Sequence, residues 1–112
     1  MLKAPYRRSR SQPWDDSMFD GATGIGSLLR LTGGDDPPEW DGIGGPNYYH
    51  DRAYHEHRPN DRKAVDKKWR ELMELAADAL AGSDPARQAL LRRKAKTRYH
   101  FVRLVGWWWW MT

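Results

Sequence analysis

The residues best suited to chemistry are concentrated in one run, YYHDRAYHEH, at positions 48–57. The run contains three of the chain's four histidines, His50, His55 and His57, together with an aspartate and a glutamate. Histidine and carboxylate side chains bind metal ions, and they also act as bases in catalysis. Three interpretations are therefore open: a metal site, one half of a catalytic dyad, or a polar helix end.

A zinc site built from the three histidines is disfavoured by their spacing. Ligands on one face of a helix lie at i and i+4, whereas His50, His55 and His57 lie at i, i+5 and i+7. Structural zinc sites also often use cysteine, and the chain has none. We expect His55 and His57 to be solvated residues at the end of a helix, so His50 stands apart as the candidate for catalysis.

The elements that must position His50 are three helices. Pro46 is suited to the first position of a helix, and a short helix is expected to carry residues 49 to about 55. A second helix is expected over about 61–81, where apolar residues recur at helical spacing until Gly82. Pro85 lies just inside a third helix, which Gly106 stops. Two long antiparallel helices with a shorter helix against them form a small all-α core.

Asp66 lies within or beside the apolar stripe of the second helix, because it shares a face with Trp69 and Met73. A carboxylate in that position must be paired or hydrogen-bonded, since an isolated buried charge is costly. One candidate partner is Arg70 at i+4. The other is a histidine of the first helix, because a buried aspartate fixes the tautomer of an imidazole and leaves its other nitrogen free to act as a base.

The composition sets limits on the fold and on the partners. A chain of 112 residues is long enough for one small domain with a limited core. Without cysteine it has no disulfides, which indicates a reducing compartment or stabilising partners. A net charge of +4 permits contact with nucleic acid or an anionic membrane surface. The basic N-terminus lacks the apolar stretch of a secretory signal, and no segment approaches the roughly 18 apolar residues of a membrane span.

Residues 1–39 differ in composition from the rest of the chain. They are polar, basic and rich in glycine, with one apolar patch formed by Ile25, Leu28, Leu29 and Leu31. This composition predicts an extended arm with a short hydrophobic anchor. We expect a partner to order the arm, and we expect Arg7 and Arg8 to contact that partner. The chain then divides into an arm (1–39), a helical domain (40–106) and a tryptophan-rich tail (107–112).

The tail carries four consecutive tryptophans: Trp107, Trp108, Trp109 and Trp110. Four successive residues do not share one face of a helix or a strand. Because each indole side chain has roughly 150–250 Å² of surface, an isolated monomer is expected to leave at least two of them largely exposed. We expect the tail to dock on a protein partner, where tryptophans are common hot spots. A phospholipid membrane interface is the alternative.

The third helix carries a basic run without any acidic residue: Arg87, Arg92, Arg93, Lys94, Lys96 and Arg98. These charges are spread around the helix rather than aligned on one side. Such a patch gives only salt-dependent affinity for nucleic-acid phosphates. We therefore expect a solvated helical surface, and a dedicated nucleic-acid site is disfavoured.

Three motifs occur in order on the expected helices: HDRAY (50–54), DRKAVDKKWRELM (61–73) and YHFVRLVG (99–106). Together they resemble the pattern of bacterial and phage phospholipase A2-like proteins, over roughly residues 41–106. The chain is also similar to a cysteine-free phage family of uncharacterised function that shares the first two elements. The segment between the glycine loop and His50 is only PNYY, which is shorter than these enzymes usually carry.

The resemblance implies a role for each matching residue. His50 would be the general base that activates water, Asp66 its orienting partner, and the hydroxyls of Tyr54 and Tyr99 would support the pair. The resemblance also implies a calcium cofactor, held by Asp51 and by backbone carbonyls of the DGIGG loop. Gly42 and Gly44 would supply those carbonyls.

The resemblance finally implies a biological setting. We expect a bacteriophage particle protein, made in the host cytoplasm, whose arm and tail dock on other particle proteins and whose core hydrolyses phospholipid esters of the host envelope. The alternative is a catalytically inactive structural protein that keeps the His–Asp pair for the integrity of its core.

Overall fold

The computed structural model of the protein describes residues 13–19 and 36–111. The regular elements in these residues are helices, and there is no strand among them. The described helices are η1 (Asp16–Met18), η3 (Pro38–Trp40), α2 (Pro46–Glu56), α3 (Arg62–Asp78), α4 (Pro85–Val105) and α5 (Trp107–Met111). The predicted all-α class is confirmed. Among these helices, none combines the length and the apolar character that crossing a membrane requires.

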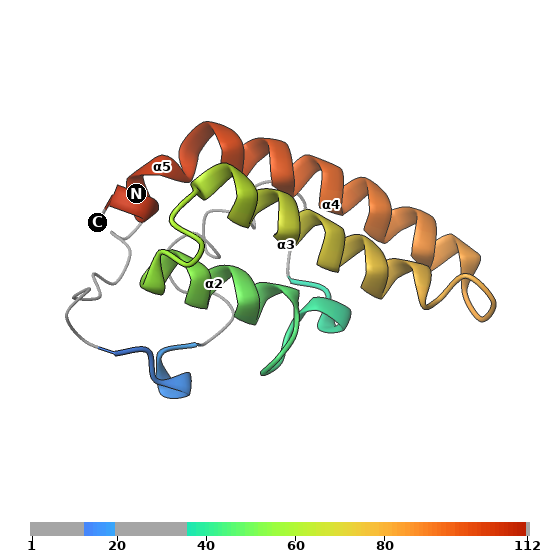
Figure 1. Cartoon of the computed structure of the whole chain (residues 1–112). Helices are drawn as coiled ribbons and strands as arrows, with labels where there is room; N and C mark the ends of the chain where they lie inside the picture. Colours follow the sequence, from blue (N-terminus) through green and yellow to red (C-terminus); the bar gives the residue numbers. More distant parts are fainter. Residues whose placement is uncertain (1–12, 20–35, 112) are drawn as a thin grey trace, which may run out of the picture.

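The two long helices α3 and α4 run antiparallel, and the shorter α2 packs against α3 (Figure 1). Capping defines where the long helices begin. The Asp61 side chain accepts from the backbone N–H groups of residues 63 and 64, and Asp84 accepts from that of residue 87. Helix α3 ends at Asp78, three residues earlier than predicted. After it, several backbone hydrogen bonds join residues three apart in sequence and form turns. Helix α2 begins three residues earlier, at Pro46.

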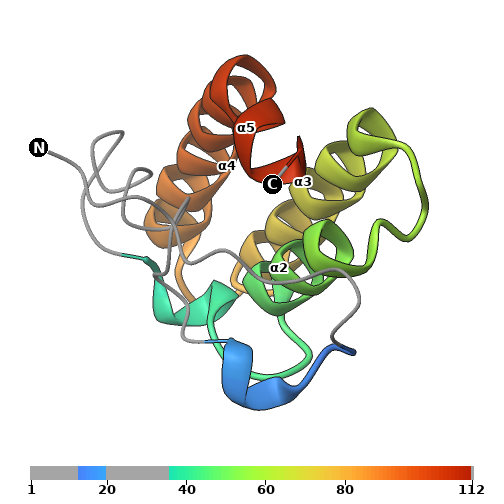
Figure 2. The ribbon, with the colours of Figure 1, turned by 90° about the vertical axis from the view of Figure 1, so that its left-hand side faces the viewer.

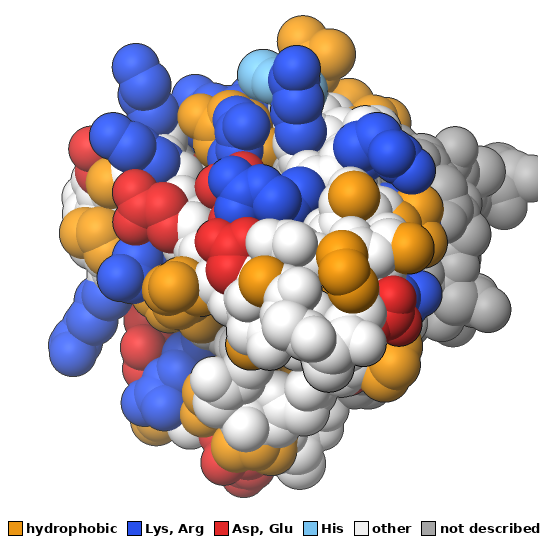
Figure 3. Space-filling view, turned by 90° about the vertical axis from the view of Figure 1, so that its right-hand side faces the viewer, with side chains coloured by type: hydrophobic (Ala, Val, Ile, Leu, Met, Phe, Trp, Pro, Cys, Tyr) orange, Lys and Arg blue, Asp and Glu red, His pale blue; other side chains and the backbone are white. Residues whose placement is uncertain are grey.

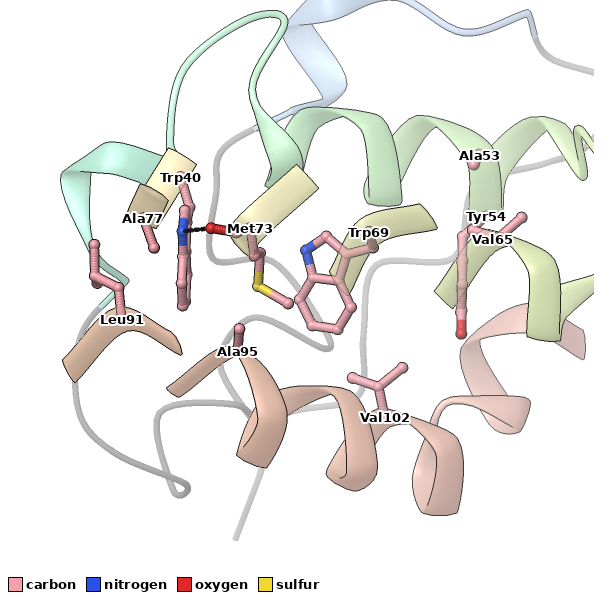
Figure 4. Packing of buried hydrophobic residues seen from close by; sticks show 10 residues of the cluster. All are labelled: Trp40, Ala53, Tyr54, Val65, Trp69, Met73, Ala77, Leu91, Ala95 and Val102. Atoms are coloured by element: carbon pink, nitrogen blue, oxygen red, sulfur yellow. Dashed lines mark hydrogen bonds between the residues drawn. The ribbon is translucent and has the colours of Figure 1, made fainter. Parts of the chain in front are cut away.

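The core is built where α3 faces α4 and η3 (Figure 4). Trp40 from η3, Trp69 and Met73 from α3, and Leu91 from α4 are all fully buried. The Trp40 Nε1–H group donates to the backbone carbonyl of Met73 at 3.1 Å, which satisfies the polar atom of a buried indole. Small residues, Ala77 and Ala95, fill the remaining contact between the two long helices.

The folded unit begins before residue 40, and this corrects the predicted boundary of the arm. Glu39 accepts two hydrogen bonds from Arg87, at 2.9 and 2.8 Å, which ties η3 to the start of α4. Asp36 pairs with Arg98, whose guanidinium also lies over the Trp40 ring. Arg98 is buried, so the expectation of a wholly solvated basic run is wrong at this position.

Part of the predicted arm also packs on the outer side of α2. Tyr48 donates through its hydroxyl to Asp16 at 2.6 Å, and its ring makes edge contacts with Trp14 and Phe19. The hydroxyl hydrogen bond from Tyr48 lowers the pKa of Asp16 below its usual value. The hydrophobic anchor predicted at Ile25 to Leu31, and the basic residues Arg7 and Arg8, lie outside the described residues.

The tryptophan-rich tail is the short helix α5, which folds back where α4 ends and α3 begins (Figure 2). The turn is at Gly106, a position that favours glycine. A Cβ atom there would lie 2.6 Å from the Val102 carbonyl oxygen and 2.9 Å from the Tyr54 hydroxyl. Trp109 and Trp110 pack against the core, whereas Trp107 and Trp108 are 56% and 36% exposed. The prediction that at least two indoles are largely exposed holds for Trp107 alone among the four, because Trp108 is about two-thirds buried. The helical form of the tail was not predicted.

Candidate functional site

His50 and Asp66 form a hydrogen-bonded pair between α2 and α3. The distance from His50 Nε2 to Asp66 Oδ1 is 2.9 Å, and the residues are 3% and 0% exposed. The pairing of the second-helix carboxylate with a histidine is therefore confirmed. The other candidate partner, Arg70, lies 3.6 Å from Glu74 and does not pair with Asp66.

Asp66 accepts hydrogen bonds from three further side chains. Tyr54 donates its hydroxyl to Oδ1 at 2.7 Å, so this oxygen is shared with His50. Arg103 and Arg62 donate to the other oxygen, Oδ2, at 2.7 and 3.3 Å. Two side chains of α2 thus donate to one carboxylate oxygen, and two guanidinium groups from α3 and α4 donate to the other.

These partners determine the charge of Asp66. Burial raises the pKa of its carboxyl, but the hydrogen bonds from His50, Tyr54 and Arg103 outweigh burial and lower that pKa below its ordinary value. Burial and the nearby Asp66 charge raise the pKa of the Tyr54 hydroxyl. At neutral pH the site therefore contains an ionised carboxylate and a neutral phenol that donates to it.

The ionised carboxylate also fixes the tautomer of His50. A carboxylate without a proton is only an acceptor, so the hydrogen on this bond belongs to His50 Nε2. In the neutral imidazole, Nδ1 then carries the lone pair. This is the tautomer in which the far nitrogen of a histidine can accept a proton.

Aromatic side chains hold the His50 ring in place. The Trp69 ring is stacked on it, with a centroid distance of 4.1 Å and an interplanar angle of 24°. The Tyr54 ring lies on the same imidazole at 4.4 Å. Trp69 is itself fixed by a hydrogen bond from its Nε1–H to Asn47 at 3.2 Å. The neighbouring aromatic rings therefore fix the plane of the His50 ring, and the hydrogen bond to Asp66 fixes its orientation.

Arg62 and Arg103 are site residues that sequence reasoning missed. Arg62 also donates to the backbone carbonyls of Val102 and Arg103, at 3.1 and 3.2 Å, and so satisfies the last carbonyls of α4. The signals were present: Arg62 lies at i−4 from Asp66, where only i+4 was considered. Arg103 is the arginine of the YHFVRLVG motif.

Tyr99 is not brought to the His–Asp pair. Its half-buried ring lies under the guanidinium of Arg70, at 5.2 Å, and makes an edge contact with His100. The α4 residue that contacts Asp66 is Arg103, one helical turn further along. Tyr54 donates a hydrogen bond directly to Asp66, which supports its predicted role. Tyr99 makes no hydrogen bond to Asp66.

The predicted calcium ligands have suitable chemistry. Gly42 and Gly44 have φ values of 101° and 87°, which favour glycine, and the Gly42 carbonyl accepts from the N–H of Gly45 at 3.1 Å. A carbonyl oxygen has a second lone pair for a hard cation. Asp51, on α2, supplies a carboxylate. These donors are oxygen atoms, the kind of ligand that calcium binds. Calcium binding stays a prediction.

The zinc alternative gains no support from the described part of the chain, in which no three histidine, cysteine, aspartate or glutamate residues form a group that could hold a metal ion. His55 and His57 lie at the end of α2 as predicted, but the expected solvation is wrong for His55 and holds only in part for His57, which is half-buried. His55 is buried, with its ring against Trp14. His57 ends α2 in the left-handed conformation and is stacked on Trp110 at 3.7 Å. The contacts of both histidines were not predicted because their partners lie in the arm and the tail.

Three comparisons with known proteins were made. No model of a protein family matches the chain, and neither curated proteins nor solved structures give a match. The geometry of the site itself therefore carries the functional interpretation.

Proposed function

We propose that the protein is a phospholipase A2-like hydrolase that cleaves phospholipid esters, with His50 as its general base. The observation that carries the proposal is the bond from His50 Nε2 to the ionised Asp66. This bond presents Nδ1 as the proton acceptor and provides a negative charge for the imidazolium that forms. The resemblance of the segments that carry His50, Tyr54 and Asp66 to phospholipase A2-like motifs also supports this reaction.

The reaction would proceed in two proton transfers. His50 Nδ1 takes a proton from a water molecule while the water oxygen bonds to the ester carbonyl carbon. When the tetrahedral intermediate collapses, the bond from that carbon to the alkoxy oxygen breaks. The imidazolium returns its proton to the departing alcohol, so the products are a fatty acid and a lysophospholipid. Throughout, Asp66 and the stacked Trp69 hold the imidazole in one orientation.

Calcium, when bound, would supply positive charge that stabilises a developing oxyanion. Asp51 and the carbonyls of Gly42 and Gly44 would hold it. The proposed setting is a bacteriophage particle, with host envelope phospholipid as the substrate and with other particle proteins as partners of the arm. The resemblance to phage proteins supports that setting.

A second candidate function is favoured by burial. His50 and Asp66 are 3% and 0% exposed, and a buried polar network of this kind also holds helices in register. In this alternative the protein is a structural component. The four partners of Asp66 then serve only to join α2, α3 and α4.

Fatty-acid release from mixed phospholipid vesicles in the presence of calcium distinguishes the two functions. The test variant is His50→Gln, which keeps a polar side chain beside Asp66. The control is Lys67→Gln, on the exposed side of α3. Hydrolysis predicts that His50→Gln lowers release by roughly 10²–10⁴-fold while both variants remain folded. The structural alternative predicts no calcium-dependent release from any variant, and a lower unfolding temperature for His50→Gln alone.

A further inference from the structure

Four large apolar side chains are exposed together where α4 ends and α5 follows. Leu104 is 76% exposed, Trp107 56%, Trp108 36% and Met111 69%. We call these four residues the C-terminal apolar surface. The packing of the domain does not need them, because Trp109 and Trp110 make the contacts of α5 with the core.

The inner side of α5 is firmly attached, so the outer residues are presented by a fixed element. Trp110 is stacked on His57, and its backbone carbonyl accepts a hydrogen bond from His57 Nε2 at 2.7 Å. The Trp110 ring also makes an edge contact with Tyr54, at 5.2 Å. Because Tyr54 donates to Asp66, the apolar surface lies at the same end of the molecule as the His–Asp pair.

The apolar surface continues into a basic one. Helix α4 contains no acidic residue. Lys96, His100 and Leu104 are exposed and follow one another at intervals of four residues, so they share one side of α4. Arg93 is exposed one turn before them. Figure 3 shows Lys and Arg side chains along the upper part and the left side of the molecule, with Asp and Glu side chains among them.

We propose that this face of the molecule docks on an anionic phospholipid membrane. Trp107, Trp108 and Met111, with Leu104, would enter the boundary between headgroups and acyl chains, where indole side chains settle. Arg93 and Lys96 would lie over the lipid phosphates. The inference deepens the proposed function, because an ester substrate held in a membrane must be reached from its surface.

Charge and size favour a lipid surface over a protein partner. A stable protein interface buries about 800 Å² on each partner, and four side chains at one helix end fall short of that area. An anionic membrane complements both halves of the face: the acyl boundary takes the apolar residues, and the phosphates take the cations. A second copy of the chain would bring like charges together.

Vesicle sedimentation with the full chain tests the proposal in the absence of calcium, using phosphatidylcholine vesicles with and without phosphatidylglycerol. Wild type is expected to bind the mixed vesicles. Trp107→Ser combined with Trp108→Ser should weaken binding by roughly tenfold or more, and Arg93→Gln or Lys96→Gln by about fivefold each. Leu75→Ser, an equally exposed apolar position on α3, and Lys67→Gln are matched controls that should bind as wild type.

Three results would overturn the proposal. The first is an absence of wild-type binding to the mixed vesicles. The second is equal binding by the double tryptophan variant and wild type. The third is a wild-type dimer that the double variant converts to a monomer, with vesicle binding unchanged, since that result assigns the surface to a second copy of the chain. Circular dichroism confirms that each variant is folded.

A second readout separates this proposal from the proposed function. On a short-chain phosphatidylcholine below its micelle concentration, the double tryptophan variant should release fatty acid at the wild-type rate, while its release from vesicles falls with its binding. Vesicle binding without any release sinks the proposed hydrolysis and leaves the docking surface intact. Release that is unaffected by the tryptophan substitutions on either substrate contradicts the docking surface alone.

Discussion

At the scale of single residues, Asp66 organises the site through four side chains from three helices: His50, Tyr54, Arg62 and Arg103. The two arginines neutralise a carboxylate that has no access to solvent. Their placement on Oδ2 leaves Oδ1 for the histidine and the phenol. The ionised state of Asp66, and with it the tautomer of His50, depends on this division.

Replacing Asp66 by Asn is expected to destabilise the protein strongly. The change keeps the shape of the side chain but leaves Arg62 and Arg103 partly buried beside a neutral amide. Removing one partner of a buried ion pair typically costs 3–5 kcal/mol, and urea unfolding would measure the loss. Asp78→Asn, which breaks an exposed pair with Arg92, is the control and should cost less than about 1 kcal/mol. Equal losses in the two variants would contradict the account.

The dependence of stability on pH follows from the lowered pKa of Asp66. A carboxyl whose pKa is lower in the folded state than in the unfolded state stabilises the protein at pH values above the unfolded pKa, which is about 3.9. That stabilisation is lost as the pH falls through the folded pKa. The difference in unfolding free energy between wild type and Asp66→Asn should therefore narrow between pH 5 and the acid limit of roughly pH 2. A difference that stays constant over this range would show that the Asp66 carboxyl has the same pKa in the folded and unfolded states, and a difference that widens toward low pH would show that Asp66 is protonated in the folded protein.

Sequence reasoning identified His50, Tyr54 and Asp66 because helical periodicity and motif order are local properties. It placed Asp66 in the core and proposed a histidine partner, which the structure confirms. It missed Arg62 because only the i+4 partner of Asp66 was considered, and it missed Arg103 because nothing local distinguishes this residue from the other basic residues of α4. Tyr99 was grouped with the site because it belongs to the same motif as Arg103, yet its side chain points to Arg70.

At the scale of elements, the bounds of the helices follow caps and glycines, while their contacts follow residues distant in sequence. Asp61, Asp84 and Pro85 are visible signals for the starts of α3 and α4. Residues 36–39 were assigned to the arm because their prolines are turn and extended-chain signals. Their partners are Arg87 and Arg98, about fifty to sixty residues later, and composition gives no indication of such pairs.

The turn between α4 and α5 is expected to require glycine. In Gly106→Ala the new Cβ would meet the Val102 carbonyl at 2.6 Å and the Tyr54 hydroxyl at 2.9 Å. Overpacking of this kind costs about 1–3 kcal/mol, because α5 or Tyr54 must shift. Thermal unfolding measures the loss. Gly82→Ala is the matched control, since a Cβ there meets no atom within 4 Å and should leave stability unchanged or raise it. Full tolerance of Ala at position 106 would mean that α5 is not docked as described.

At the scale of the whole molecule, the ends of the chain complete the helical core. Trp14 and Phe19 cover α2 from one side, and Trp110 closes the gap between His57 and Tyr54 from the other. Trp69 and Tyr54 cover His50 directly, and Trp110 in turn contacts Tyr54. The tail therefore has two roles: two of its tryptophans pack against the domain, and the other two face outward.

The central claim is that the fixed imidazole of His50 is a general base and not only a structural residue. Calcium-dependent fatty-acid release from mixed phospholipid vesicles, compared between His50→Gln and Lys67→Gln, tests this most directly. The account predicts release by wild type and by Lys67→Gln, and a loss of roughly 10²–10⁴-fold in folded His50→Gln. Release by folded His50→Gln at the wild-type rate, or no release by wild type, would contradict it.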